Sequence, residues 1–215
     1  MPTDNNYEIA ISKPAMADMP LAHFGGEVTV VDTPEGVEAA IARLYALPVV
    51  GFDTETRPNF HKGEMHKVAL MQVSGPERCY LFRLNHTGLD DTLIHWLADP
   101  RRIKVGLSLK DDFHQLHQLR EFEPAGFVEL QQLVRDFHIT DASLQKIYAI
   151  IFGRRISKGQ RLTNWEAPEL TPPQQAYAAL DAYACLEIYN ALASSQFDPS
   201  KSPYKVIPSQ EITEQ

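Results

Sequence analysis

Cysteines and long apolar runs are both scarce in this chain of 215 residues. The two cysteines, Cys79 and Cys185, lie in separate apolar contexts and support neither a disulfide framework nor a zinc site, so we expect two buried small hydrophobic residues. No stretch approaches the length of a membrane span. Residues 1–10 have neither the basic start nor the apolar run of a secretory signal. These absences predict a soluble, cytoplasmic protein without a membrane partner.

Positive charge is in the minority, with 20 Lys and Arg against 28 Asp and Glu and a formal net charge of -8. Nonspecific coating of nucleic acid is driven by clustered basic residues, so the composition argues against that class of protein. It does not exclude a nuclease, because bound cations neutralise acidic residues. A local basic strip at Arg154, Arg155, Lys158 and Arg161 could also meet a phosphate backbone.

The length and the hydrophobic content of 44% predict one domain with one substantial core. We place this domain at residues 26–193. The flanking segments, 1–25 and 194–215, carry several prolines and show no hydrophobic periodicity. They are expected to be poorly ordered tails or surface straps.

Hydrophobic periodicity and turn residues predict an α/β domain with a mixed central sheet flanked by helices. The expected strands are 28–31, 49–53, 68–73, 79–82, 104–107 and a short element at 128–130. The expected helices are 34–47, 89–98, 111–122, 131–137, 143–152 and 172–193. The turn signal Ser74-Gly75-Pro76 joins two of the strands and favours an antiparallel meander.

The first group of chemical interest is Asp53-Thr54-Glu55 at the end of an apolar strand. Residues two apart on a strand point to the same face, so the two carboxylates are presented together. Such a pair raises a pKa or requires a cation between its members, and magnesium and manganese prefer oxygen ligands. A solvated turn is the usual explanation of an isolated Asp-x-Glu, so this motif alone is weak.

Two further acids are expected on inward helix faces. In the segment after Gly106, Asp112 falls near the centre of the apolar arc, whereas its neighbour Asp111 lies to one side. A favourable position near the helix dipole explains Asp112 equally well. In the last long helix, Asp181 lies within the apolar stripe one turn after Tyr177. An acid inside a packing face is costly unless it is paired or bound to a metal.

Three separate segments are thus each expected to point an acidic side chain towards the interior. The combination of the three motifs is a more specific signal than any one of them. No Lys or Arg occupies an inward position in these motifs, so the four carboxylates are best explained by bound divalent cations. With these motifs the chain resembles the DEDD superfamily of 3′-to-5′ exonucleases. It is most similar to the Werner-syndrome-type exonuclease domain and the ribonuclease D nuclease domain.

The resemblance spans roughly residues 28–192. Its first motif is matched by Phe52 to Pro58 and by the continuation 67–73, its second by Val105 to Asp112 and Leu116, and its third by Tyr177 and Asp181. Ser157-Lys158 and Asn164-Trp165-Glu166 are similar to the segment that precedes the third motif. A tyrosine in place of histidine at the third motif is typical of the DEDDy subgroup.

The resemblance implies a ribonuclease-H-like fold and hydrolysis of nucleotides from a free 3′ end with two divalent cations, Mg²⁺ or Mn²⁺. Asp53, Glu55 and Asp181 would hold the metal that activates water, and Asp53 would bridge to a second metal supported by Asp112. Tyr177 would orient the attacking water, and Glu55 would also contact the terminal 3′ hydroxyl. No helicase domain and no helical nucleic-acid-binding domain of larger relatives is found in the sequence.

Five other residues are candidate substrate or metal contacts. Lys158 and Arg161 are candidates for phosphate contact, and Trp165 either stacks a base or anchors its loop by packing. His114 and His117, three apart on one helix, are a weak metal signal without further ligands. The leading hypothesis is an exonuclease acting on DNA 3′ ends. A ribonuclease D-like exoribonuclease is the nearest alternative, because the motifs do not read the sugar, and a nuclease-derived binding module is the alternative from another class.

Overall fold

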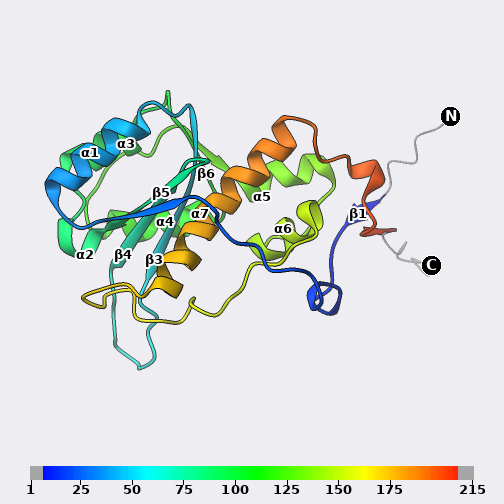
Figure 1. The fold of residues 1–215 in the computed structure, drawn as a ribbon, viewed down its shortest axis with the longest axis horizontal. Coiled ribbons are helices and arrows are strands. Elements are labelled where there is room, and N and C mark those ends of the chain that lie inside the picture. Colours follow the sequence, from blue (N-terminus) through cyan, green and yellow to red (C-terminus); the bar gives the residue numbers. More distant parts are fainter. Residues whose placement is uncertain (1–6, 208–215) are drawn as a thin grey trace, which may run out of the picture.

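The computed structural model describes residues 7–207 and is built around a six-stranded mixed sheet (Figure 1). The strands are β2 (Glu27–Val31), β3 (Val49–Thr56), β4 (Val68–Ser74), β5 (Arg78–Arg83), β6 (Ile103–Gly106) and β7 (Phe127–Glu129). Their order across the sheet is β2-β5-β4-β3-β6-β7. All six predicted strands are present, and the mixed sheet with flanking helices confirms the expected fold class.

The centre of the sheet is the expected antiparallel meander of β3, β4 and β5. β2 pairs parallel to β5, β6 pairs parallel to β3, and β7 pairs parallel to β6. Asp53 lies opposite Gln72 in the β3–β4 register, and Glu55 lies opposite Leu70. Cross-strand partners share a face, so both acids face the same side of the sheet as Gln72 and Leu70.

Helices cover both faces. They are α1 (Pro34–Leu44), α2 (Leu84–Thr87), α3 (Asp91–Leu97), α4 (Leu109–His117), α5 (Leu130–Leu133), α6 (Leu144–Phe152) and α7 (Pro172–Ala193). One hydrophobic cluster joins α1, α3 and α4 to one side of the sheet. Two others join α6 and α7 to the opposite side, where α7 crosses the strands (Figure 1). Within residues 7–207, no helix is both long and apolar enough to cross a membrane.

α7 has the strongest start signal of these helices. Thr171 and Gln174 form a reciprocal capping box, and prolines occupy the first two helical positions. The predicted bounds of this helix, 172–193, agree with the structure. Gln174 also donates to Thr163 Oγ1 at 3.0 Å and to the Asn164 carbonyl oxygen at 3.1 Å, so the preceding loop is fixed to the first turn of α7.

Among the predicted helices, two differ most from the structure. The helix predicted to reach Phe122 ends at His117, whose ring nitrogen lies 3.0 Å from the Phe122 carbonyl oxygen, so the chain turns back on the helix end. The helix predicted at 131–137 is divided into α5 and a 3-10 turn, Val134–Phe137, which ends where His138 adopts a left-handed φ of 62°. Apolar periodicity continued through both ends because the turned segments still pack on the core.

The terminal segments act as straps where they are described. β1 (Glu8–Ile9) pairs antiparallel with β8 (Lys205–Val206), which joins the first and last described segments. Ile9 and Ile11 are buried, so the first segment contributes to the core. Of the two expectations for these ends, the strap applies to residues 7–25 and 194–207. Residues 1–6 and 208–215 of the expected tails lie outside the described residues.

Candidate active site

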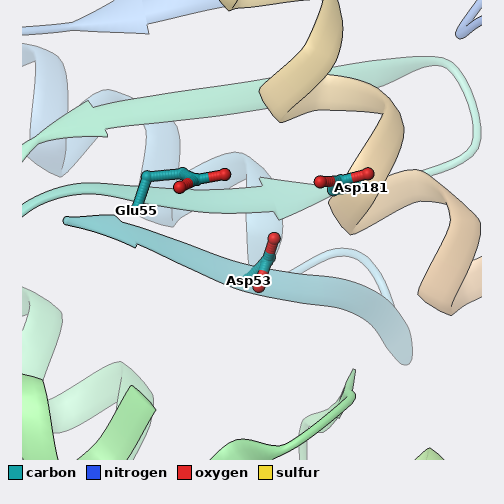
Figure 2. A group of neighbouring side chains, drawn as sticks. All are labelled: Asp53, Glu55 and Asp181. Carbon is teal, nitrogen blue, oxygen red and sulfur yellow. The ribbon is translucent and has the colours of Figure 1, made fainter. Parts of the chain in front are cut away.

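Three acidic side chains converge where the end of β3 faces α7. Asp53 and Glu55 extend from β3 and Asp181 extends from α7, and each offers a carboxylate oxygen within 4.8 Å of the others (Figure 2). The carboxylic acid side chain of Asp181 is buried, as its position within an apolar stripe of the helix predicts. Like charges so close together repel one another strongly unless protons or cations lie between them.

Asp112 approaches the same strand from α4. It is buried, whereas Asp111 is exposed, as the helical phase predicts. The hydroxyl of Thr54 donates a hydrogen bond of 2.5 Å to Asp112 Oδ1. Asp112 lies outside the group of three that share a 4.8 Å separation. Thr54, the residue between the two acids of the first motif, therefore ties Asp112 to β3.

The start of α4 is fixed by Glu129 at the end of β7. The Glu129 carboxylate accepts hydrogen bonds from the backbone N–H groups of Ser108 and Leu109, at 3.1 and 2.8 Å. Ser108 has a left-handed φ of 64° and offers no side-chain cap of its own. A carboxylate at a helix N-terminus satisfies free N–H groups and favours the helix dipole. Glu129 thus sets the position from which Asp112 reaches the site.

Burial and mutual repulsion raise the pKa of every carboxyl in the group. Burial raises the pKa of Asp53 well above its usual value, and the charges of Asp112, Asp181 and Glu55 add to it. Burial, then Asp181 and Asp112, raises the pKa of Glu55, while Arg161 opposes the shift. Burial raises the pKa of Asp181 to about 7, although a hydrogen bond from Tyr177 lowers it. These shifts are typical of carboxylates that require a counter-charge.

Tyr177 and Trp165 pack together beside this group. The Tyr177 hydroxyl lowers the pKa of Asp181, and burial followed by the charges of Asp181 and Glu55 raises the pKa of Tyr177. Trp165 is fully buried, with its ring centroid 6.1 Å from that of Tyr177. A base could not reach the indole in this position. The expectation that Trp165 stacks a base is therefore corrected, and the packing alternative applies.

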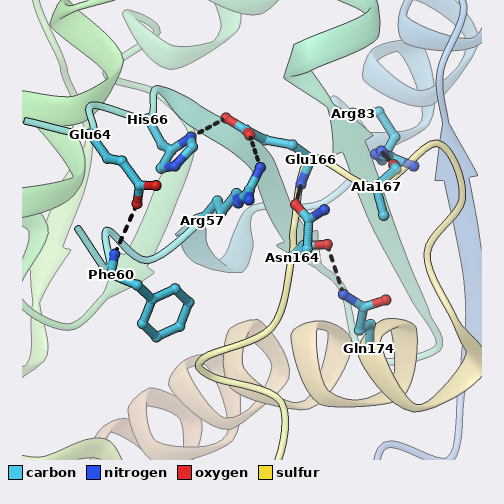
Figure 3. A network of polar contacts seen from close by, with 9 residues as sticks. All are labelled: Arg57, Phe60, Glu64, His66, Arg83, Asn164, Glu166, Ala167 and Gln174. Atoms are coloured by element: carbon cyan, nitrogen blue, oxygen red, sulfur yellow. Dashed lines mark hydrogen bonds and ion pairs between the residues drawn. The ribbon is translucent and has the colours of Figure 1, made fainter.

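Two loops at the β3 and α7 ends are joined by polar contacts (Figure 3). The first, residues 57–67, links β3 to β4, and the second, residues 153–171, links α6 to α7. Glu166 of the second loop accepts from Arg57 Nη1 at 3.4 Å and lies 3.1 Å from His66 Nδ1. Buried Arg83 of β5 donates to the backbone carbonyls of Ala167 and Pro168. The second loop is thereby held against the sheet.

The remaining predicted contacts have different surroundings. Lys158 and Arg161 are exposed on the 153–171 loop, and the charge of Arg161 lowers the pKa of Glu55. His114 and His117 line a separate cavity of about 540 Å³ beside α4, away from the three converging acids. Thr54, Glu129 and Glu166 were not assigned a role from the sequence. Only Thr54 carried a local signal, since it lies between two acids and points to the opposite face of the strand.

Comparisons with known proteins agree with this geometry. A protein-family model described as 3'-5' exonuclease matches residues 28–195. A 3'-5' exonuclease of Arabidopsis thaliana is 28% identical over 202 residues, covering 85% of this chain and 69% of the relative. The bifunctional 3'-5' exonuclease/ATP-dependent helicase WRN of Mus musculus is 32% identical over 160 residues, covering 71% of this chain and 11% of that protein.

Solved structures show the same fold. Escherichia coli RNase D has a TM-score of 0.71 and 20% identity, covering 78% of this chain and 44% of that chain. The Nibbler EXO domain of Aedes aegypti has a TM-score of 0.69 and 23% identity, covering 81% of this chain and 92% of that chain. The expected ribonuclease-H-like fold is confirmed. Because the family match covers most of the described residues, this chain belongs to the 3'-5' exonuclease family, and it is an enzyme of that class.

Proposed function

We propose that the chain removes nucleotides from the 3′ end of nucleic acid with the help of two divalent cations, Mg²⁺ or Mn²⁺. The observation that carries this proposal is the convergence of Asp53, Glu55 and Asp181 within 4.8 Å. Asp181 Oδ1 is buried and has no hydrogen-bond partner within residues 7–207, so one ligand position faces the group without a donor. An all-oxygen donor set of this kind suits hard divalent cations.

The position of each residue suggests its role. Asp53, Glu55 and Asp181 would hold one cation, and Asp53 with Asp112 would support the second. Bound cations of this kind supply a water nucleophile and stabilise the attacking and departing oxygens of an in-line phosphoryl displacement. The Tyr177 hydroxyl, next to Asp181, orients the attacking water, and Glu55 receives the terminal 3′ hydroxyl. Thr54 and Glu129 hold Asp112 in place.

The substrate we propose is a strand with a free 3′ end. The 57–67 and 153–171 loops together carry seven Lys or Arg and three Glu, in a chain whose net charge is -8. Positive charge is therefore concentrated on the two loops that adjoin the acids, where a phosphate backbone would pass. Lys158 and Arg161 are the phosphate contacts we propose on the second loop. A cytoplasmic location remains a prediction from the sequence.

DNA is the favoured substrate, and RNA is the alternative. DNA is favoured because the motifs resemble those of the Werner-syndrome-type exonuclease domain, and the mouse exonuclease/helicase is a relative of that type. A ribonuclease D of Gluconacetobacter diazotrophicus is 27% identical and covers 75% of this chain, and a Trypanosoma brucei RNase D structure contains the RNA U12. These favour RNA. The choice depends on contacts near the 2′ position of the sugar.

The test uses 5′-labelled single-stranded DNA and RNA of one sequence, incubated with the pure protein and magnesium, manganese or chelator. Asp181→Ala is the inactive variant, and Asp111→Ala is the matched control because Asp111 is exposed. We expect a ladder that shortens from the 3′ end, with the faster substrate identifying the sugar. The ladder should vanish with chelator and with Asp181→Ala only. Binding of the strand without any metal-dependent ladder would replace this proposal with a binding module.

A further inference from the structure

A cavity of about 250 Å³ is lined in part by Tyr177, the residue one helical turn before Asp181. Three segments form its walls: the N-terminal strap (residues 7–25), the 153–171 loop and the first turns of α7. Its walls include His23 and Phe24 from the strap, Ser157 and Gln160 from the loop, and Ala176 and Tyr177 from α7. His23 and Ala176 are exposed to solvent at the opening. The cavity is therefore open and shares one wall with the active site.

The strap is fixed against the loop by three hydrogen bonds around Arg155. Ala22 N–H donates to the Arg155 carbonyl oxygen at 2.9 Å, and Arg155 N–H donates to the Pro20 carbonyl oxygen at 3.0 Å. The Arg155 side chain donates to the Met19 carbonyl oxygen at 3.0 Å. Phe24 packs on Tyr183 of α7, with ring centroids 4.8 Å apart. The cavity is thus a formed feature with walls held from both sides.

We propose that this cavity binds one nucleobase of the strand that enters the active site, an inference that rests on the proposed function. Its size is just below the 300–1,000 Å³ of pockets for drug-sized ligands, which suits a single base. Phe24, Ala176 and the Tyr177 ring give apolar surface for a base face. His23 can stack on a base, and the Gln160 amide and Ser157 hydroxyl can hydrogen bond to its edge.

The path of the strand supports this placement. Tyr177 is one turn from Asp181, so a nucleotide in the cavity would be a close neighbour of the one at the acids. Lys158 and Arg161 stand exposed on the same loop as Ser157 and Gln160, where they can contact the phosphates between the two positions. His23 and Phe24 precede residue 28, where the family match begins. The base site is thus partly built by a segment outside the family domain.

The experiment measures binding without hydrolysis. Fluorescence anisotropy with 5′-labelled single strands is recorded in chelator, and each of the last four nucleotides is replaced in turn by an abasic site. Ala176→Leu fills the cavity, and Ala39→Leu is the matched control, since Ala39 is an exposed alanine on α1. His23→Ala, with His95→Ala as control, removes a wall without adding bulk. Thermal melting establishes that each variant is folded.

We expect one abasic position to weaken wild-type binding roughly tenfold, as for the loss of one stacked base. Ala176→Leu should weaken binding of the intact strand by a similar factor and lose the sensitivity at that position, while Ala39→Leu retains both properties. His23→Ala should reduce the same sensitivity. The proposal would be overturned if an abasic site reduced the binding affinity equally in the wild type and in both cavity variants. It would also be overturned if the wild type bound no strand. If all these binding results were obtained but added metal produced no hydrolysis, the base site would stand and the proposed nuclease function would fail.

Discussion

Gly51 on β3 lies directly under the carbonyl oxygen of Ala182 on α7: a Cβ atom at Gly51 would stand 1.8 Å from it. A Cβ atom cannot come so close to a carbonyl oxygen, so only glycine, which has no Cβ, permits this crossing. The crossing is two residues from Asp53 and one from Asp181. The approach of β3 to α7 therefore sets the separation of the acids on the two elements.

Replacing Gly51 with alanine should separate α7 from β3. We expect Gly51→Ala to lower the free energy of unfolding by about 3 kcal/mol, in the range of overpacked cores, and to weaken Mn²⁺ binding because Asp181 moves away from Asp53. Chemical denaturation and calorimetric titration measure the two effects. Gly25→Ala is the control, since a Cβ at Gly25 meets nothing within 4 Å. Unchanged metal affinity in a destabilised Gly51→Ala would refute the link between crossing and site.

Asp111 and Asp112 offer a test of helical phase. If Asp112 supports a second cation as proposed, Asp112→Asn should reduce hydrolysis at least roughly a hundredfold by removing that charge, while Asp111→Asn at the exposed neighbour leaves the rate within about twofold. Initial rates at saturating Mn²⁺ make the comparison. If both variants were equally active, the buried acid on α4 would have no part in catalysis.

The sequence predicted this difference, but not how Asp112 is held. Apolar periodicity encodes which side of a helix is buried, so Asp112 could be separated from Asp111, and α7 could be bounded by its prolines and capping box. Thr54 and Glu129 are distant in sequence from α4 and contact it only after the sheet forms, so no local pattern predicts these contacts. Lys104 is a similar case: it is fully buried and donates to the Trp96 and Asp99 carbonyl oxygens, which periodicity does not anticipate.

Stability without metal should fall as the pH rises. Burial raises the pKa of Asp112 to about 6 and that of Asp181 to about 7, and burial also raises those of Asp53 and Glu55. At a pH between the pKa of these carboxyls in the unfolded chain and their higher pKa in the native state, the native state binds more protons. The resulting contribution to the free energy of unfolding is complete at low pH and is lost as the pH rises past the native-state pKa values. In chelator, the free energy of unfolding should be lower at about pH 8 than at about pH 5.5 by roughly 1–3 kcal/mol.

Two comparisons assign that dependence to the acidic group. Asp181→Asn should flatten the profile, whereas Asp111→Asn, which removes only the smaller effect of Asp111 on the pKa of Asp112, should change it little. Saturating Mn²⁺ should restore stability at the higher pH, because a ligand of the native state stabilises it by mass action. A profile that stays equally steep in Asp181→Asn would place its origin elsewhere in the protein.

The Tyr177 hydroxyl should affect turnover more than metal binding. Tyr177→Phe keeps the ring packed against Trp165 but removes the hydroxyl that lowers the pKa of Asp181. We expect kcat to fall roughly ten- to a hundredfold, the scale of a lost water-orienting group, with Mn²⁺ affinity within about threefold of wild type. Tyr183→Phe, a half-buried tyrosine on the same helix, is the control. A Tyr177→Phe enzyme with normal kcat would remove the hydroxyl from the mechanism.

Glu166 should matter for the order of the two loops more than for overall stability. It pairs with Arg57 and His66 of the 57–67 loop, and its own backbone N–H donates to Asn164 Oδ1 at 3.0 Å. Partly exposed ion pairs contribute little, so Glu166→Ala should lower the free energy of unfolding by only about 1 kcal/mol. Release of both partners should nevertheless allow the 57–67 loop to open locally.

Limited trypsin digestion follows that opening, because the 57–67 loop contains Lys62 and Lys67, whereas Arg57 precedes Pro58 and is not a trypsin site. Cleavage within the loop should be several-fold faster in Glu166→Ala than in wild type, and KM for a single strand should rise because the basic loop no longer holds one position. Glu169→Ala, at an exposed acid three residues further along the same loop, should change neither property. Equal cleavage rates in the two variants would mean that the loop keeps its position without Glu166, and the basic side chains would then be held by the strand ends of β3 and β4 alone.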